Sequence, residues 1–246
     1  MFPIRDHNPS GRTPYVTFTL IAVNALVFLA TWPGLADHQI NRVFMDWGLI
    51  PARLMQGDGV ATIVSSMFLH AGWMHILGNM LFLYIYGDNL EDEMGHGGFF
   101  LFYLLSGLAA AFAQVAMSPY SPIPMVGASG AIAGVMGGYL LLFPKAKVDV
   151  LFIFVIFFRI FAIPAWIVLG VWFALQIFSG ISVPGEGGGV AYWAHVGGFA
   201  GGLILTLPAL MRRGGKDYWR RTEGHPPHPE ADYRFAKSSI PRVPRR

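Results

Sequence analysis

Cysteine is absent from the sequence, and charged residues are scarce. Without cysteine the chain cannot form disulfides, use a thiolate in catalysis or hold zinc through cysteine ligands. Charged residues make up 13% of the 246 residues, whereas soluble domains carry about 25%. Hydrophobic residues make up 54%, and the mean hydropathy is +0.50. This balance predicts one large polytopic α-helical membrane domain, because several apolar stretches approach the roughly 20 residues that cross a bilayer.

Six transmembrane helices are predicted from the apolar stretches and the residues that interrupt them. Their approximate ranges are 16–32, 74–87, 99–117, 129–143, 162–178 and 191–211. The predicted fold class is all-α, a six-helix transmembrane bundle over residues 16–211. Residues 1–15 form a predicted cytoplasmic segment, and residues 212–246 form a basic cytoplasmic tail predicted to be disordered. We predict no cleavable signal peptide, because the first apolar run ends at Trp32-Pro33, which does not suit a small-residue cleavage site.

Three segments between these spans have less regular patterns. Residues 33–60 are predicted to form a loop in the membrane interface, with Trp47 as an anchor. Asp88 and the acidic residues that follow it are predicted to end the second span in water. Residues 148–161 are interpreted as interfacial or as a helix extension, because the apolar stretch 148–179 is too long for one span and short for two.

The distribution of Lys and Arg predicts the orientation in the membrane. With six spans and the N-terminus inside, 15 of the 17 basic residues lie on the inner side, and only Arg42 and Arg53 lie outside. This asymmetry follows the positive-inside rule and predicts that both termini are cytoplasmic. The basic residues report topology, so the net charge of +3 is not taken as a sign of nucleic-acid binding. We expect a multi-pass protein of a bacterial-type plasma (inner) membrane.

The stretch Gly127-Ala128-Ser129-Gly130 stands where a proline-containing loop enters the fourth predicted span. A serine between small residues at the first turn of a membrane helix can expose its hydroxyl, and its backbone N–H is one of the unpaired donors of the helix start. One residue can thus supply a nucleophile and half of an oxyanion site. The alternative reading is a helix cap with a small packing face, since glycine and serine are common where membrane helices touch.

Four polar residues on three predicted spans share one depth near the outer side. His75 lies at the start of the second span, with Asn79 one turn deeper on the same face. Ser129 opens the fourth span, and His195 lies about one turn into the sixth. Ser129 and His195 fit a nucleophile with its general base, and His75 and Asn79 fit oxyanion donors together with the Ser129 N–H. Each residue alone also has a structural reading, as a hydrogen bond between helices or as a buried histidine.

Glycines recur at every fourth residue on the two helices that carry this serine and this histidine. They are Gly130, Gly134 and Gly138 on the fourth span, and Gly198 and Gly202 on the sixth. Small residues at this spacing let two backbones approach closely. Such an approach would bring Ser129 within hydrogen-bond reach of His195.

At these residues the chain resembles the rhomboid intramembrane serine proteases. The matching stretches are His75-Ile76-Leu77-Gly78-Asn79, Gly127-Ala128-Ser129-Gly130, and Ala194-His195 followed by Gly198 and Gly202. They occur in the family's order, on its second, fourth and sixth spans, and the resemblance covers about residues 15–211. Together the motifs are specific, whereas GxSG alone is not.

The resemblance implies a six-helix bundle with a water-filled cavity open to the outside. It implies that Ser129 is the nucleophile and His195 its base, in a dyad without a carboxylate, and that His75, Asn79 and the Ser129 amide stabilise the oxyanion. Substrates would be membrane proteins, often single-span, cut near the outer end of a span with helix-breaking small residues. The implied partners are these substrates and the lipid bilayer. No metal and no organic cofactor are implied, and the oligomeric state stays open.

The chain departs from the family pattern at two places. Many members carry a Trp-Arg pair in the first loop, where this chain has Ala61-Thr62. Some members place a tyrosine one turn after the nucleophile, where it stacks on the base, and this chain has Ala133 there. The first departure concerns how the long loop is anchored, and the second concerns what supports the ring of His195.

Three other functions fit parts of the pattern less well. A non-catalytic member of the same fold that binds membrane helices typically lacks the serine or the histidine, and both are present here. A metal-dependent enzyme would use His70, His75, His96 or His195, but no HExxH occurs and His96 falls on the inner side. A transporter would need more charge at the bilayer midplane. The favoured interpretation is therefore a serine endopeptidase, with the non-catalytic helix-binding protein as the alternative.

Overall fold

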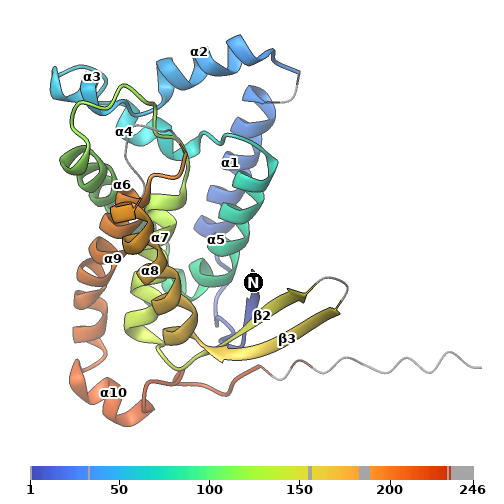
Figure 1. Cartoon of the computed structure of the whole chain (residues 1–246). Coiled ribbons are helices and arrows are strands. Elements are labelled where there is room, and N and C mark those ends of the chain that lie inside the picture. The colour runs from blue at the N-terminus through green and yellow to red at the C-terminus, as the bar shows by residue number, and fades with distance from the viewer. Residues whose placement is uncertain (1, 33, 155–156, 183–188, 232, 234–246) are drawn as a thin grey trace, which may run out of the picture.

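The structure is a computed structural model that describes residues 2–32, 34–154, 157–182, 189–231 and 233. Six apolar helices run side by side through its middle (Figure 1). They are α1 (Tyr15–Thr31), α5 (Trp73–Met94), α6 (His96–Met117), α7 (Ser129–Leu142), α8 (Ala165–Ser182) and α9 (Tyr192–Arg212). Each coincides with one predicted span, so the prediction of a mostly helical membrane protein is confirmed.

The number of membrane crossings stays a prediction. Among the described residues, α6, α8 and α9 are long and apolar enough to cross a bilayer by themselves. A fourth span results if α5 is joined to the short helical segment Thr62–Phe68, from which it is bent by 96°. Helices α1 and α7 are apolar but shorter, so their lengths alone do not establish a crossing.

The connection between α1 and α5 is largely helical, whereas the sequence suggested an interfacial loop. It contains α2 (Asp37–Trp47), α3 (Pro51–Met55), α4 (Thr62–Ser65) and the 3-10 helix η1 (Ser66–Phe68). These elements cover one end of the bundle (Figure 1). Pro51 suits the first position of α3, where no backbone N–H is needed. Just before α3, the backbone of Leu49 pairs with that of Met125 in the loop that precedes α7.

Helix α5 extends seven residues beyond the end of the predicted second span, and the acidic residues do not end it. The helix continues to Met94, and one of these acidic residues, Glu91, binds the start of α1 inside the protein. Its carboxylate is buried and accepts hydrogen bonds of 2.8 Å from the backbone N–H groups of Val16 and Thr17. These are unpaired donors at the start of α1, where a negative charge is favoured.

An antiparallel three-stranded sheet lies at the opposite end from α2 (Figure 1) and corrects the all-α fold class. Its strands are β1 (Phe2–Asp6), β2 (Lys147–Phe154) and β3 (Phe157–Pro164), in that order. Residues 148–154 and 157–161 therefore lie in two paired strands rather than in a helix extension. The run is rich in Val, Ile and Phe, which favour strands over helices. The predicted cytoplasmic segment 1–15 supplies the third strand.

The beginning of the predicted disordered tail is folded. Residues Lys216–Thr222 form α10, and later residues return to β1, where the Ala231 N–H donates to the carbonyl oxygen of His7 at 2.9 Å. Lys147 also forms a 2.8 Å ion pair with Glu230. Backbone pairing and this ion pair tie the segment to the sheet, which composition alone did not indicate. Residues 234–246 of the predicted tail lie outside the described part of the chain.

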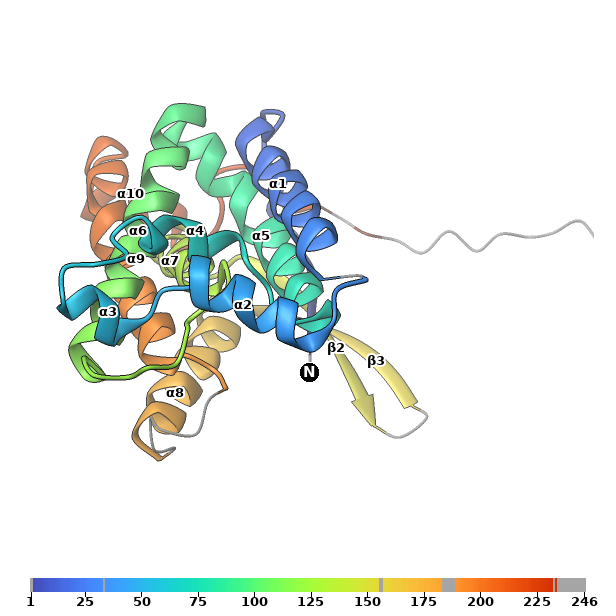
Figure 2. The same ribbon diagram turned by 90° about the horizontal axis from the view of Figure 1, so that it is seen from above.

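Helix α7 forms the centre of the bundle, with α5, α6, α8 and α9 around it (Figure 2). Eleven of its 14 residues are buried. Its closest neighbour is α9: a Cβ atom on Gly198 would collide with the carbonyl oxygen of Gly130, and one on Gly202 with that of Gly134. The glycines therefore allow backbone contact between the two helices, which is how small residues act in membrane bundles.

Candidate active site

Ser129 is the first residue of α7, and the loop before it has a conformation that requires glycine. Gly127 has φ +127°, in the region that favours glycine, and its N–H donates to the carbonyl oxygen of Ser66 at 2.9 Å. A Cβ atom at this position would lie 2.8 Å from His75 Nε2 and 3.6 Å from Ser129 Oγ. Both the backbone angle and the lack of space thus require glycine. His75 Nε2 and Ser129 Oγ therefore both lie within 4 Å of the same point.

Ser129 and His195 are joined directly across the α7–α9 contact. His195 Nε2 lies 2.8 Å from Ser129 Oγ, within the distance at which a base can take a hydroxyl proton. His195 is largely buried, with 8% of its surface exposed. The two residues that the sequence placed at one depth are therefore brought together by the close helix packing.

Helix α8 supplies the second hydrogen bond of the His195 ring. Gln176 Oε1 lies 2.8 Å from His195 Nδ1. The Gln176 amide nitrogen faces the carbonyl oxygen of Trp172, one turn earlier in α8, at 3.4 Å, which leaves the amide oxygen for the histidine. With Nδ1–H donating to Gln176, the neutral ring presents an unprotonated Nε2 to Ser129.

Trp172 also packs against the histidine. The two ring centroids lie 5.6 Å apart, with an angle of 38° between the planes. Some family members support this ring with a tyrosine at the position of Ala133 in α7. Here the aromatic side chain against the ring comes from α8. Sequence reasoning missed both α8 residues. Gln176 did carry a signal, since a polar side chain within an apolar span usually faces the bundle interior.

His75 and Asn79 present two hydrogen-bond donors that no other described residue engages. His75 Nδ1 accepts the backbone N–H of Ala71 at 3.2 Å, so the neutral ring carries its proton on Nε2, which would lie 2.8 Å from a Cβ atom on Gly127. Asn79 is 8% exposed, and its amide nitrogen is buried without a hydrogen-bond partner among the described residues. A buried donor without a partner is costly, which suggests a ligand or water at this position.

A further glutamine holds the start of α9. Gln114 Oε1, on α6, accepts the backbone N–H of Ala194 at 3.2 Å. This N–H belongs to the first turn of α9, where helical donors lack partners. The contact fixes the backbone directly before His195, and sequence reasoning did not identify it.

The histidines considered as metal ligands do not form a cluster. Within the described residues, no group of three or more His, Cys, Asp or Glu side chains is arranged to hold a metal ion. His70 stacks edge-on against His75, with ring centroids 5.0 Å apart. His96 instead lies at the sheet end of the bundle and pairs with Glu91.

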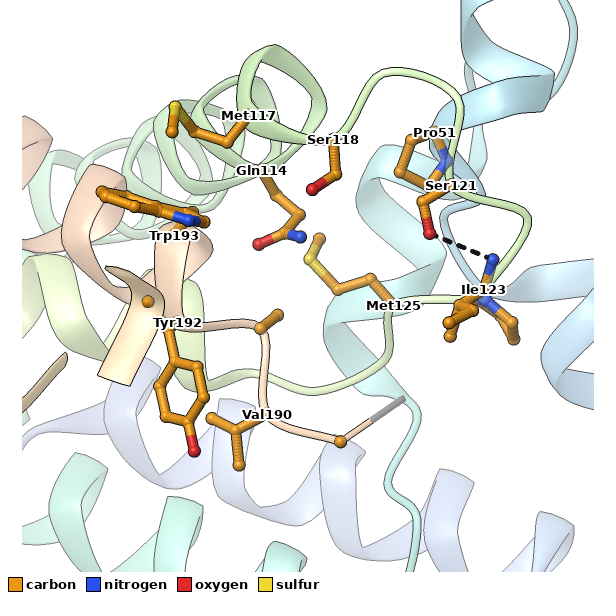
Figure 3. Close-up of a pocket in the computed structure, with 14 residues that line it drawn as sticks. Pro51, Gln114, Met117, Ser118, Ser121, Ile123, Met125, Val190, Tyr192 and Trp193 are labelled. Atoms are coloured by element: carbon orange, nitrogen blue, oxygen red, sulfur yellow. Dashed lines mark hydrogen bonds between the residues drawn. The ribbon is translucent and has the colours of Figure 1, made fainter. Parts of the chain in front are cut away.

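A cavity of about 370 Å³ lies beside the Ser129–His195 pair and does not include it. It is bounded by the end of α6, the loop before α7 and the first residues of α9. Figure 3 shows Gln114 and Met125 between Trp193 on one side and Ser121 on the other. Met125 and Trp193 are each within four residues of the candidate pair, so the cavity adjoins the candidate site through both chain segments.

Fold and geometry define the class of this protein: a helical membrane protein with a serine and a histidine hydrogen-bonded between two central helices. The family model described as "Rhomboid domain" matches residues 58–212. This is more than half of the chain, and the chain therefore belongs to the rhomboid family, whose members are multi-pass membrane proteins. The resemblance inferred from the motifs is confirmed.

Relatives with similar sequences come from several organisms. "Rhomboid protein 1, mitochondrial" of Saccharomyces cerevisiae is 31% identical over 77% of this chain and 51% of its own length. "Rhomboid-related protein 2" of Mus musculus is 30% identical over 76% of this chain and 60% of its own length. "Rhomboid protease GluP" of Bacillus subtilis is 33% identical over 59% of this chain and 26% of its own length. The chain thus spans between about a quarter and three fifths of the relatives it matches.

Proposed function

We propose that this protein is an intramembrane serine endopeptidase in which Ser129 is the nucleophile and His195 the general base. The observation that carries the proposal is the 2.8 Å contact between His195 Nε2 and Ser129 Oγ, in a ring whose other nitrogen is engaged at 2.8 Å by Gln176. A nucleophile, a base and a group that orients the base are the three parts of this chemistry. The membership of a named protease, GluP, in the matched family supports the same reaction class.

Each side chain has a defined task in the proposed reaction. Ser129 Oγ attacks the peptide carbonyl carbon while its proton passes to His195 Nε2, and the ring becomes an imidazolium that donates through Nδ1 to Gln176. The carbonyl oxygen becomes an oxyanion. His195 then gives the proton to the leaving amine, and water, activated by the same ring, releases the acyl group from Ser129.

The oxyanion would be held by donors on two helices. They are the backbone N–H of Ser129 at the start of α7, the Asn79 amide and His75 Nε2–H. The last two are unengaged by other described residues, and His75 Nε2 and Ser129 Oγ lie within 4 Å of the same point, the place of a Cβ atom on Gly127. Donors that are fixed before the reaction are favourable because they need no reorganisation when charge develops.

The proposed substrates are transmembrane proteins cut near the outer end of a span. Ser129 is at the end of α7 nearer α2 and α3, and the positive-inside distribution makes this the outer end. We propose a multi-pass protein of the plasma (inner) membrane with both termini in the cytoplasm. Reporter fusions at residue 120 and at the C-terminus should read outside and inside, and an outside C-terminus would refute this orientation.

Reaction with an alkyl fluorophosphonate tests the proposed chemistry without knowledge of the natural substrate. We expect the full chain in detergent to form one adduct, mapped to Ser129 by mass spectrometry and unaffected by a chelator. His195→Ala should abolish the reaction, while Gly97→Ala, at an exposed position of α6 with no atom within 4 Å of the added Cβ, should react as the wild type does. Absence of any adduct on the folded wild type would favour the non-catalytic helix-binding alternative, and loss of reaction with chelator would favour a metal-dependent enzyme.

A further inference from the structure

The β2–β3 hairpin has an apolar outer half that the rest of the protein does not cover. In the register of the two strands, Ile153 pairs with Phe158 and Leu151 with Ile160, so that these four side chains share one face. Phe158 is 67% exposed, Ile153 48% and Ile160 38%. Large apolar side chains gathered at one exposed place indicate an interaction surface. We call Leu151, Ile153, Phe158 and Ile160 the hairpin face.

The opposite face of the hairpin is also mainly apolar in its outer half. Phe161 is 45% exposed and packs edge-on against Phe152, with ring centroids 5.3 Å apart. The single charge there is Arg159, whose guanidinium lies 5.5 Å from the Phe161 ring centroid. No ion pair between Arg159 and a described carboxylate occurs.

Among the described residues, the ion pairs of the hairpin lie in its inner half. Asp149 is held by Arg5 at 2.7 Å and by His7 at 2.9 Å, and Lys147 pairs with Glu230 at 2.8 Å. The hairpin therefore changes along its length from an ion-paired base to an apolar outer half. This gradient is the one expected of a segment that passes from water into a membrane boundary.

The position of the hairpin agrees with this gradient. Figure 1 shows β2 and β3 leaving the sheet end of the bundle and rising beside the lower part of α5, and Figure 2 shows them projecting beyond the outline of the helices. Helix α8 begins at Ala165, directly after β3, and exposes Trp166 (55%) and Val171 (45%). An exposed tryptophan at the end of a membrane helix marks the interface level. The hairpin face is thus continuous in sequence with the lipid-facing side of α8.

We propose that the hairpin face binds the lipid bilayer, in the leaflet on the side of the N-terminal strand, at the boundary between headgroups and acyl chains. The strand edges limit its depth. Among the described strands, β3 lies at the edge of the sheet, and its outer side has no partner strand. Open strand edges are not tolerated in hydrocarbon, so water and lipid polar groups must remain within reach. Arg159 can extend along this boundary to lipid phosphate, as long basic side chains do at membrane surfaces.

A second copy of the chain is the competing occupant, because an open edge of β3 could pair with another β3. The lipid is favoured, since both faces of the outer half are apolar and the hairpin stands beside the helices at their own level. Edge pairing between two copies would leave the hairpin face itself exposed.

Because the sequence has no cysteine, a single introduced cysteine can be labelled at a chosen position. Single cysteines at Phe158→Cys and Ile153→Cys carry a nitroxide label in the full chain, reconstituted in vesicles of phosphatidylethanolamine and phosphatidylglycerol. Ile204→Cys, 65% exposed on α9, is the membrane reference, and Arg220→Cys, 81% exposed on α10, is the water reference. Collision of the label with oxygen is compared with collision with a water-soluble nickel chelate.

We expect the ratio of oxygen to nickel collisions at 158 and 153 to exceed that at 220 several-fold and to approach, without reaching, that at 204. Ratios at both hairpin positions equal to that at 220 would overturn the proposal. Spin–spin broadening at 158 that persists when the protein is diluted with lipid, together with a low oxygen collision rate, would assign the surface to a second copy instead. Two label positions guard against a local distortion at either one, and neither belongs to the proposed catalytic site.

Discussion

Gln176 offers the sharpest perturbation of the proposed site, because it contacts the His195 ring through Nδ1, the nitrogen that does not face Ser129. Gln176→Leu keeps much of the side-chain volume and removes the oxygen that lies 2.8 Å from Nδ1. In the proposed transition state that hydrogen bond joins an imidazolium, and bonds to charged groups contribute about 1.5–3 kcal/mol. At 1.36 kcal/mol for each factor of ten, the rate of reaction at Ser129, measured as labelling by a fluorophosphonate, should fall roughly 10- to 100-fold.

Gln176→Glu changes the same contact in the opposite direction. A carboxylate beside the ring favours its protonated form, so the acidic limb of the pH–rate profile should move to higher pH. A residue with a purely structural role would change the amount of folded protein and leave this profile in place. Leu175→Met, on the exposed side of the same helix, is the matched control and should behave as the wild type.

The assay is the rate of labelling by an alkyl fluorophosphonate as a function of pH, with unfolding midpoints measured on the same samples. An unchanged rate in Gln176→Leu, together with an unshifted profile in Gln176→Glu, would refute the positioning role. The support of the His195 ring from α8 would then be assigned to Trp172. If the wild type does not label at all, the proposed function fails before the role of Gln176 is tested.

The remaining predictions concern three other positions. Gly127→Ala should reduce labelling at least tenfold, since its Cβ would lie 2.8 Å from His75 Nε2 at a φ of +127°; labelling as strong as in Gly97→Ala would contradict the geometry. Asn79→Ala should lower kcat by less than the roughly 10²–10³ known for a sole side-chain oxyanion donor, with the unfolding midpoint unchanged. An unchanged kcat with a lowered midpoint would assign Asn79 to structure. Burial raises the pKa of Asp6 to about 8 from 3.8, so the folded state holds this proton more tightly than the unfolded chain. The resulting stabilisation is present below pH 4 and is lost as pH rises through about 8; Asp6→Asn should flatten the dependence of the unfolding midpoint on pH between 5 and 8, and a slope equal to that of the wild type would contradict this.

Hydrophobic runs predicted the helices well because each long run must bury or immerse an apolar surface. The glycine spacing on α7 and α9 also predicted the contact that brings Ser129 to His195, since the smallest side chains allow the closest backbones. These are local signals with one dominant physical cause. They do not establish how many of the helices cross the membrane, because α7 is short and α5 follows a bend.

The parts that sequence reasoning missed depend on contacts between distant residues. The apolar run 148–163 fits a strand as well as a helix, and the choice is made by β1, more than 140 positions away. Glu91 looked like a helix end until the start of α1 supplied its donors. Gln176 was an ordinary polar residue until the ring of His195 came beside it. In each case the interaction partner is far away in the sequence, so the residue alone does not identify the contact.

The central claim is that Ser129 and His195 act as one catalytic unit, and a comparison of three variants tests it most directly. Ser129→Ala, His195→Ala and the double variant are placed in liposomes with a set of single-span model substrates, and cleavage products are identified by mass spectrometry. Residues that act as a unit are not additive, so all three variants should retain the same small residual rate, far below the wild type. Near-normal cleavage by Ser129→Ala would contradict the account.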